Sequence, residues 1–98
     1  MTNDRRPDDR VVGVWVVYIV ECADRSLYTG ITNNLVRRVD EHNTGRGARY
    51  TRGRGPVTLR YHELQPDRSS ASTRECEIKS LSRREKMELI NQTAIERI

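Results

Sequence analysis

The longest apolar run lies near the start of the chain, at Val11–Cys22, with the sequence VVGVWVVYIVEC. β-Branched residues dominate it almost without interruption, which is typical of a strand covered on both faces. A turn at Ala23–Arg25 separates this run from a second candidate strand, Ser26–Ile31. A proline introduces a third candidate strand, Val57–Leu64, and Pro66-Asp67 ends it.

Helix signals occupy the remaining segments. Thr32, Asn33 and Asn34 offer N-cap side chains for a helix over Leu35–Asn43, which Gly45 ends. After the third strand, a helix is expected to begin somewhere in Ser69–Ser72 and to run to about Leu81. A last helix restarts at Ser82, because Ser82-Arg83-Arg84-Glu85 is a capping box. Its apolar face consists of Met87, Ile90, Ala94 and Ile98.

The element order ββαβαα predicts an α+β fold, a small three-stranded and mostly antiparallel sheet flanked by helices. The polar segment Met1–Arg10 is expected to be a disordered tail, with residues 11–98 forming a single domain.

Composition narrows the class of protein. Leu, Ile, Val and Phe make up about 21% of the 98 residues and 33% are charged, so the core is thin. A large multidomain enzyme, a transporter and a cofactor-burying barrel are excluded. No apolar stretch approaches the ~18 residues of a membrane span, and the polar start does not resemble a signal peptide. We therefore expect a cytoplasmic protein whose two cysteines, Cys22 and Cys76, are free, buried thiols.

The positive charge is concentrated in arginine. The net charge of +4 comes from 18 basic and 14 acidic residues, and 16 of the 18 are Arg, whose planar guanidinium suits phosphate. Between His42 and His62 there is no acidic residue but there are five arginines. Codon bias can explain the ratio of Arg to Lys but not this window, which favours a polyanionic partner. The Gly/Arg loop Gly45–Gly55 is predicted to bind nucleic acid through Arg46, Arg49, Tyr50, Arg52 and Arg54.

The spacing of two tyrosines, Tyr18 and Tyr28, indicates a candidate site. If the hairpin loop is the three residues Ala23–Arg25, Val20 faces Tyr28 and Tyr18 faces Gly30. Both tyrosines then share one face within ~7–8 Å, whereas a two- or four-residue loop would put them on opposite faces. Gly30 would leave space opposite Tyr18, so the two hydroxyls suggest a site, and a hydrogen-bonded core pair is the alternative.

Helical geometry singles out three further side chains. On the first helix Arg38 and His42 border the apolar face while Arg37 points to solvent, so Arg38 and His42 form either part of a site or a salt bridge with a snorkelling arginine. On the second helix Glu75 faces inward and needs a cation. If that helix begins at Ser72, Glu75 instead completes a capping box, and Glu77 is the fallback carboxylate.

These residues carry a resemblance to a known family. Val17-Tyr18-Ile19, ten residues before Tyr28-Thr29-Gly30, resembles the paired signature of the GIY-YIG nuclease superfamily. Arg38 and His42 match that family's helix positions and Glu75 matches its metal-binding Glu. The tracts CADRSLYTGITNNLVRRVDEHNTG, GARYTRGRGPV and IKSLSRREK resemble the small stand-alone YhbQ-type (URI domain) branch. The match covers roughly residues 14–90. The family's downstream Asn has no clear counterpart, and Asn91 is left out of the site.

The resemblance implies a metal-dependent DNA endonuclease that hydrolyses phosphodiester bonds. One divalent ion, Mg²⁺ or Mn²⁺, would be held by Glu75, and Arg38 would stabilise charge on the phosphate. Tyr18 would activate the attacking water, helped by Tyr28 or His42. This role needs the tyrosine pKa lowered from ~10 toward 7 by Arg38 and the metal, whereas His42 is an alternative base that needs no shift.

We expect no separate DNA-binding domain, so structure- or single-strand-directed cutting in DNA repair or processing is expected rather than sequence-specific cutting. We expect neither a membrane partner nor a small-molecule cofactor. The competing hypothesis is a non-catalytic module that binds DNA or structured RNA through the same arginine loop. A purely structural interaction domain explains neither the loop nor the tyrosines.

Overall fold

The computed structural model describes residues 14–96. The elements, in chain order, are β1 (Trp15–Glu21), β2 (Leu27–Thr32), α1 (Leu35–Asn43), the short 3₁₀ helix η2 (Arg49–Thr51), β3 (Thr58–Gln65), α2 (Arg68–Lys79) and α3 (Arg83–Glu96). Apart from η2, which lies inside the predicted loop, this is the predicted order ββαβαα. The α+β class is therefore confirmed.

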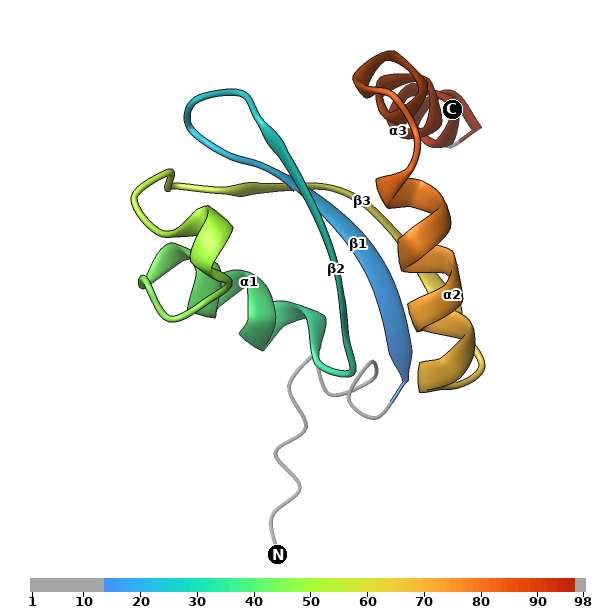
Figure 1. The fold of residues 1–98 in the computed structure, drawn as a ribbon, viewed down its shortest axis with the longest axis horizontal. Coiled ribbons are helices and arrows are strands. Elements are labelled where there is room, and N and C mark those ends of the chain that lie inside the picture. Colours follow the sequence, from blue (N-terminus) through green and yellow to red (C-terminus); the bar gives the residue numbers. More distant parts are fainter. Residues whose placement is uncertain (1–13, 97–98) are drawn as a thin grey trace, which may run out of the picture.

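The sheet has the order β2-β1-β3, and both pairs of strands are antiparallel. Val16 to Val20 of the central strand are fully buried, as the uninterrupted apolar run predicts. Helix α1 covers one face, where Tyr18 and Val20 pack with Leu35, while α2 and α3 cover the other, where Ile19 packs with Ile78 (Figure 1). Edge strand β2 thus lies between α1 and α2 in this view.

The β1–β2 hairpin has the three-residue loop on which the tyrosine geometry depends. The N–H of Cys22 donates to the carbonyl of Ser26 at 2.8 Å, and Arg25 takes the left-handed conformation, with φ 74°. The carboxylate of Asp24 accepts from both the backbone N–H and the hydroxyl of Ser26, which fixes the turn. The resulting register pairs Tyr18 with Gly30 and Val20 with Tyr28, so the predicted pairing is confirmed.

Helix α1 has the predicted bounds. The side chain of Asn34 accepts from the N–H of Arg37 at 3.2 Å, and Gly45 follows the helix with φ 82°. Asn43, the last residue of α1, holds the start of the third strand, because its side chain accepts from the N–H of Val57. This contact fixes both ends of the intervening loop against the sheet.

The predicted start of α2 is wrong, and the reason is a cap. The helix begins at Arg68, before the expected Ser69–Ser72, because Asp67 is the N-cap and its carboxylate accepts from Ser70 N at 2.8 Å. It ends at Lys79, before the expected Leu81. The capping box of α3 is confirmed, since the side chains of Ser82 and Glu85 each accept from the other's backbone N–H.

The two cysteines differ in exposure. Both are free, and Cys22 is buried, but Cys76 is exposed, so the expectation of two buried thiols is wrong for Cys76. The buried face of α2 is narrow, with Ala71 and Ile78 on it, and Cys76 lies outside that stripe. The expected tail at residues 1–10 and the apolar contact of Ile98 lie outside the described residues. No helix within residues 14–96 is long and apolar enough to cross a bilayer.

Candidate active site

A chain of hydrogen bonds runs from the sheet through α1 into the loop. The hydroxyl of Tyr18 lies 2.8 Å from Nε2 of His42, and Nδ1 of His42 lies 2.8 Å from Oγ1 of Thr51. The Thr51 hydroxyl in turn donates to the carbonyl of Ala48 at 2.9 Å. All three side chains of this chain are buried, with His42 only 2% exposed.

The direction of these bonds fixes where the protons are. A hydroxyl has one hydrogen, and Thr51 gives it to Ala48, so Thr51 must accept from His42. His42 therefore carries its proton on Nδ1, and its Nε2 accepts the proton of the Tyr18 hydroxyl. The result is a neutral histidine held ready to accept a proton from a buried phenol.

Tyr28 completes the aromatic wall of this cluster. Its ring centroid lies 6.4 Å from that of Tyr18 and 5.3 Å from that of His42. Its other neighbour is Tyr50 of the loop, stacked at 6.0 Å, over whose ring the guanidinium of Arg54 lies at 4.3 Å. The loop is thereby packed against the tyrosine pair that the sequence places on one face of the sheet.

Two glycines make room for the cluster. A Cβ at position 30 would lie 2.7 Å from the Tyr18 hydroxyl, so the space that the sequence predicts opposite Tyr18 is filled by the tyrosine itself. Gly47 is buried against α1, where a Cβ would lie 2.3 Å from Nδ1 and 2.8 Å from Cα of His42. Because Cα is backbone, the second collision cannot be relieved by turning a side chain.

The two adjacent arginines of α1 point as the helical geometry predicts. The side chain of Arg37 is 73% exposed, whereas that of Arg38 is 30% exposed. Both bind the carboxylate of Glu41, Arg38 through Nη1 at 3.0 Å and Arg37 through Nε at 3.3 Å. The predicted salt bridge of Arg38 therefore exists, and Arg38 also lies close enough to Tyr18 to affect its ionisation.

The pKa of Tyr18 moves in the opposite direction to the one that the sequence analysis requires. Burial raises the pKa of Tyr18 to about 12, and the neighbouring Arg38 guanidinium lowers it only in part. The charges of Tyr28 and Glu75 raise it further. From the sequence, Arg38 and the metal ion together are expected to lower this pKa toward about 7. Among the protein's own groups burial outweighs Arg38, and the contribution of the metal ion stays a prediction. Burial, together with the charge of Arg38, lowers the pKa of His42, which keeps the imidazole neutral.

Glu75 approaches the cluster from α2. It lies well inside the helix, which begins at Arg68, so the alternative in which Glu75 caps a helix starting at Ser72 is wrong. Its side chain is 18% exposed and pairs with Lys79 at 3.0 Å, and its charge reaches Tyr18. The fallback carboxylate Glu77 is more exposed and pairs with Arg74. Glu75 is therefore the carboxylate of α2 that the fold brings toward Tyr18.

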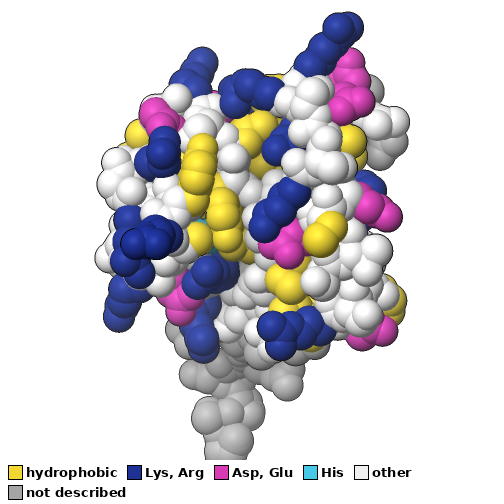
Figure 2. All heavy atoms as spheres, viewed as in Figure 1, with side chains coloured by type: hydrophobic (Ala, Val, Ile, Leu, Met, Phe, Trp, Pro, Cys, Tyr) yellow, Lys and Arg dark blue, Asp and Glu magenta, His cyan; other side chains and the backbone are white. Residues whose placement is uncertain are grey.

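The arginines of the Gly45–Gly55 loop fall into two groups. Arg54 binds Asp24 of the hairpin at 2.5 Å, and its carbonyl accepts from the N–H of Ala23, so it anchors the loop to the sheet. Arg46, Arg49 and Arg52 are exposed and form no ion pair with any residue in the described range. Figure 2 shows basic side chains in dark blue over α1 and the loop that follows it, where every basic side chain except His42 is an arginine.

This constellation coincides with a family model. The model of the GIY-YIG catalytic domain matches residues 14–88, which include every element except the end of α3. The chain belongs to the GIY-YIG family. GIY-YIG domains form a nuclease superfamily. The family predicted from the residues Tyr18, Tyr28, Arg38, His42 and Glu75 is therefore confirmed.

Several curated GIY-YIG relatives are similar over most of this chain. UPF0213 protein CPE1444 of Clostridium perfringens is 53% identical over 79 residues, 81% of this chain and 85% of the relative. UPF0213 protein HQ_3675A of Haloquadratum walsbyi is 59% identical over 73 residues, 74% of this chain and 82% of the relative.

Two solved structures are similar to this chain in fold and in sequence. The solution NMR structure of UPF0213 protein BH0048 from Bacillus halodurans has a TM-score of 0.53 and 46% identity, covering 81% of this chain and 84% of that one. The solution NMR structure of protein EF2693 from E. faecalis has a TM-score of 0.58 and 32% identity, covering 97% of this chain and 93% of that one. None of these names states an activity.

Two residues of the GIY-YIG site were missed in the sequence. Thr51 orients His42, and Gly47 allows the loop to approach it, yet both lie in an irregular segment where no periodicity marks a buried position. The sequence signal for these two buried positions was weak, because it consisted of one threonine and several glycines among arginines. The functional roles assigned to the loop arginines and to the five matched residues stay predictions.

Proposed function

We propose that this GIY-YIG domain is a metal-dependent endonuclease that hydrolyses phosphodiester bonds in DNA. The observation that carries the proposal is the buried hydrogen bond from the Tyr18 hydroxyl to Nε2 of a neutral His42, beside Arg38 and Glu75. It supplies a proton acceptor behind the phenol, next to a guanidinium that can bind a phosphate. The family supports nuclease chemistry in general, and the geometry supports this particular division of roles.

Tyr18 would act as the group that takes the proton from water. With a pKa of about 12, ionising it at pH 7 costs roughly 7 kcal/mol if the proton goes to bulk solvent. Passing the proton directly to Nε2 of His42 keeps it beside the phenolate as a hydrogen-bonded imidazolium, and the attraction between these two charges works against the lowered pKa of His42. The phenolate oxygen would then accept a proton from water as the water oxygen bonds to phosphorus. The P–O bond to the leaving sugar oxygen would break, that oxygen would take a proton from solvent, and His42 would release its stored proton to solvent, which restores the resting site.

His42 is less suited to be the direct base. Both of its ring nitrogens are engaged in hydrogen bonds, one with Tyr18 and one with Thr51. We therefore assign proton abstraction to Tyr18 and proton storage to His42, with Tyr28 forming the wall against which both rings pack.

Arg38 would hold the phosphate. It is half-buried, and the hydrogen bonds of its guanidinium to Glu41 and to Tyr18 outweigh burial and raise the pKa of Arg38. A permanently charged guanidinium beside the phenol stabilises both the phenolate and the negative charge on the phosphoryl oxygens. The side chain of Arg37 is about 100° further around the helix and 73% exposed, so it points to solvent rather than to Tyr18.

Glu75 is the residue that would hold the divalent ion. Among residues 14–96, no three His, Cys, Asp or Glu side chains are grouped closely enough to form a metal site. Mg²⁺ fits such a sparse environment, because it keeps several waters and is commonly bound by one or two carboxylates together with substrate phosphates. Within the described residues the half-buried Glu75 carboxylate forms an ion pair with Lys79 alone, and it would be such a ligand. The ion, Mg²⁺ or Mn²⁺, would stabilise charge on the leaving oxygen.

The substrate is proposed from the surface around the site. The exposed Arg46, Arg49 and Arg52 would bind the phosphates of the strand and supply affinity rather than chemistry. Tyr50 already stacks on Tyr28, so a base would have to stack at its remaining exposed part. We propose structure- or single-strand-directed cutting of DNA in the cytoplasm, in a repair or processing role.

The test is a cleavage assay on single-stranded, branched and duplex DNA with Mg²⁺, Mn²⁺ or EDTA. Cleavage that needs the metal ion and is abolished by EDTA supports the endonuclease. The second candidate is a non-catalytic nucleic-acid-binding module, which the same exposed arginines also support. Binding of DNA without metal-dependent cleavage of any substrate would favour this second candidate.

A further inference from the structure

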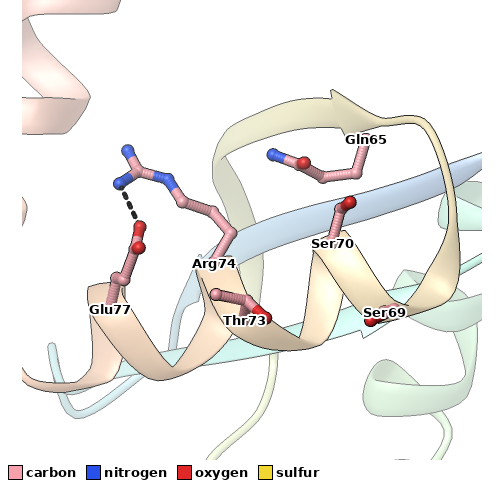
Figure 3. A pocket seen from close by; sticks show the side chains of 6 residues that line it. All are labelled: Gln65, Ser69, Ser70, Thr73, Arg74 and Glu77. Atoms are coloured by element: carbon pink, nitrogen blue, oxygen red, sulfur yellow. Dashed lines mark hydrogen bonds and ion pairs between the residues drawn. The ribbon is translucent and has the colours of Figure 1, made fainter.

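The polar hollows of the described surface differ in how their arginines are neutralised. In the hollow of Figure 3, beside α2, Arg74 lies 3.1 Å from the carboxylate of Glu77. A second carboxylate, Glu63, which the figure does not draw, accepts from Arg74 at 2.7 Å. Another hollow, near the hairpin, contains Arg25 and Arg60, and both pair with Glu21. In each of these hollows carboxylates already engage the arginines, which makes both poor sites for an external anion.

A third hollow of about 260 Å³ lies where α1 and α2 begin, and we call it the Trp15 hollow. The side chains that matter to its chemistry are Trp15, Thr32, Arg37, Arg38, Glu41 and Arg68. Three arginines here face one carboxylate, which leaves an excess of positive charge. Glu41 is shared by Arg37 and Arg38, and Arg68 forms no ion pair with any residue of the described range.

Arg68 is held in place by an aromatic ring instead. Its guanidinium carbon lies 5.5 Å from the centroid of the Trp15 ring, a cation–π contact that leaves the N–H donors free to bind an anion. The half-buried Trp15 packs against the core of the α2 face, so it is a rigid platform. A guanidinium beside an indole is the combination that binds a phosphate next to a stacked base or sugar.

The Trp15 hollow is continuous with the active site through Arg38. This arginine lines the hollow and also influences Tyr18. The nine residues of α1 span about 13 Å, with the Trp15 hollow at the start of the helix and the exposed loop arginines after its end. The active-site side chains Arg38 and His42 project from the helix between these two positively charged regions.

We propose that the Trp15 hollow binds a nucleotide that flanks the scissile phosphodiester, with Arg37 and Arg68 as ligands of its phosphate and Trp15 against its base or sugar. This inference rests on the proposed function and deepens it. The loop arginines bind the strand on one side of the cleaved bond, and the Trp15 hollow binds it on the other. Shortening the strand on the hollow side then weakens binding without touching Tyr18, His42 or Glu75.

Trp15 makes the test direct, because it is the single tryptophan of the chain. The full-length protein is titrated, in EDTA so that nothing is cleaved, with a short single-stranded oligodeoxynucleotide while tryptophan fluorescence is followed. We expect a saturable change in fluorescence. A change with poly-aspartate and none with the oligonucleotide would overturn the proposal, since it would assign the hollow to an acidic peptide.

The double variant Arg37→Gln/Arg68→Gln supplies the second measurement. Loss of two phosphate contacts should flatten the log–log dependence of affinity on salt by about 1.4 for a single strand. It should weaken binding roughly five- to tenfold and raise KM more than it lowers kcat. The matched control is the double variant Arg83→Gln/Arg84→Gln, which removes the same number of charges from two exposed arginines of α3 and should change nothing.

The outcomes separate this proposal from the proposed function. Metal-dependent cleavage by the wild type, with no fluorescence change and an unchanged salt slope in the double variant, would overturn the subsite and leave the endonuclease standing. A fluorescence change and a flattened slope without any cleavage would support the subsite and contradict the endonuclease. A wild type that neither binds nor cuts DNA would overturn both.

Discussion

The hydroxyl of Tyr18 lies 2.8 Å from Nε2 of His42, and the bond has a defined direction because Thr51 occupies the other ring nitrogen as an acceptor. The phenol of β1 and the imidazole of α1 thus form one buried unit whose proton can move between them. Its consequences for activity, stability and pH dependence can be tested separately.

The first prediction concerns Tyr18→Phe. Removing the hydroxyl should lower turnover by about 10²–10⁴-fold if Tyr18 abstracts the proton. It should also cost about 1–3 kcal/mol of unfolding free energy, because Nε2 of the buried His42 loses its partner. Turnover is measured at saturating DNA and metal, and stability by chemical denaturation. The control is Tyr61→Phe, which removes a tyrosine hydroxyl from the opposite face of the sheet and should leave turnover unchanged.

The second prediction is a loss of stability in acid that depends on His42. Burial lowers the pKa of His42 in the folded chain, so below about pH 6.5 the unfolded chain binds more protons at this residue than the folded chain does. Stability from this group is therefore fully present above about pH 6.5 and is lost as the pH falls through the lowered value. Cleavage should fall in the same direction, because a protonated His42 cannot accept from Tyr18.

Unfolding free energies measured across this pH range check the second prediction. His42→Gln should abolish this part of the pH dependence, while His62→Gln, at an exposed position on β3, should keep it. An identical pH dependence in wild type and His42→Gln would show that another group is responsible.

The third prediction compares the adjacent arginines of α1. Arg38→Gln should reduce kcat far more than Arg37→Gln, because only Arg38 lies near Tyr18, whereas Arg37 is 73% exposed. Both substitutions remove one charge and one contact to Glu41, so they are matched to each other. Equal losses of kcat would contradict the separate role of Arg38, and equal rises of KM with kcat unchanged would mean that both arginines act only as binding charges.

The fourth prediction concerns the close approach of the loop to α1. Gly47→Ala places a Cβ 2.8 Å from the Cα of His42, so the loop must move away and Thr51 must loosen its hold on the imidazole. We expect lower stability and slower cleavage. Gly55→Ala is the control, because a Cβ there would meet only the Asn43 side chain at an ordinary 3.8 Å. Unchanged melting and cleavage in Gly47→Ala would contradict the positioning role of Thr51.

Local signals in the sequence predicted the fold well. The turn residues Ala23–Arg25 set the loop length, and because side chains alternate along a strand, that length alone placed Tyr18 and Tyr28 on one face. The N-cap Asn34 of α1 and the Ser82–Glu85 capping box of α3 were also predicted correctly. All of these features depend on residues that are neighbours in sequence. The early start of α2 at the Asp67 cap was missed, since serines nearby offer equivalent caps.

The site was predictable only in part, because its properties depend on packing between distant segments. Helical geometry separated Arg38 from Arg37, yet the bond from His42 to Thr51 joins α1 to an irregular loop that no periodicity describes. The raised pKa of Tyr18 follows from complete burial, which depends on α1, β2 and the loop together. The sequence shows which charged residues are near one another. It does not show whether burial or a neighbouring charge has the larger effect on the pKa of Tyr18.

The most direct test of the whole account is cleavage of DNA by Glu75→Gln beside the wild type, with Mg²⁺ present and melting followed on the same samples. The substitution keeps the size of the side chain and removes only its charge and the contact to the exposed Lys79, so the fold should survive. We predict that wild type cuts DNA only with the metal ion, that Glu75→Gln binds DNA but does not cut it, and that both melt alike. Cleavage by Glu75→Gln at the wild-type rate, with the same dependence on Mg²⁺, would contradict the account.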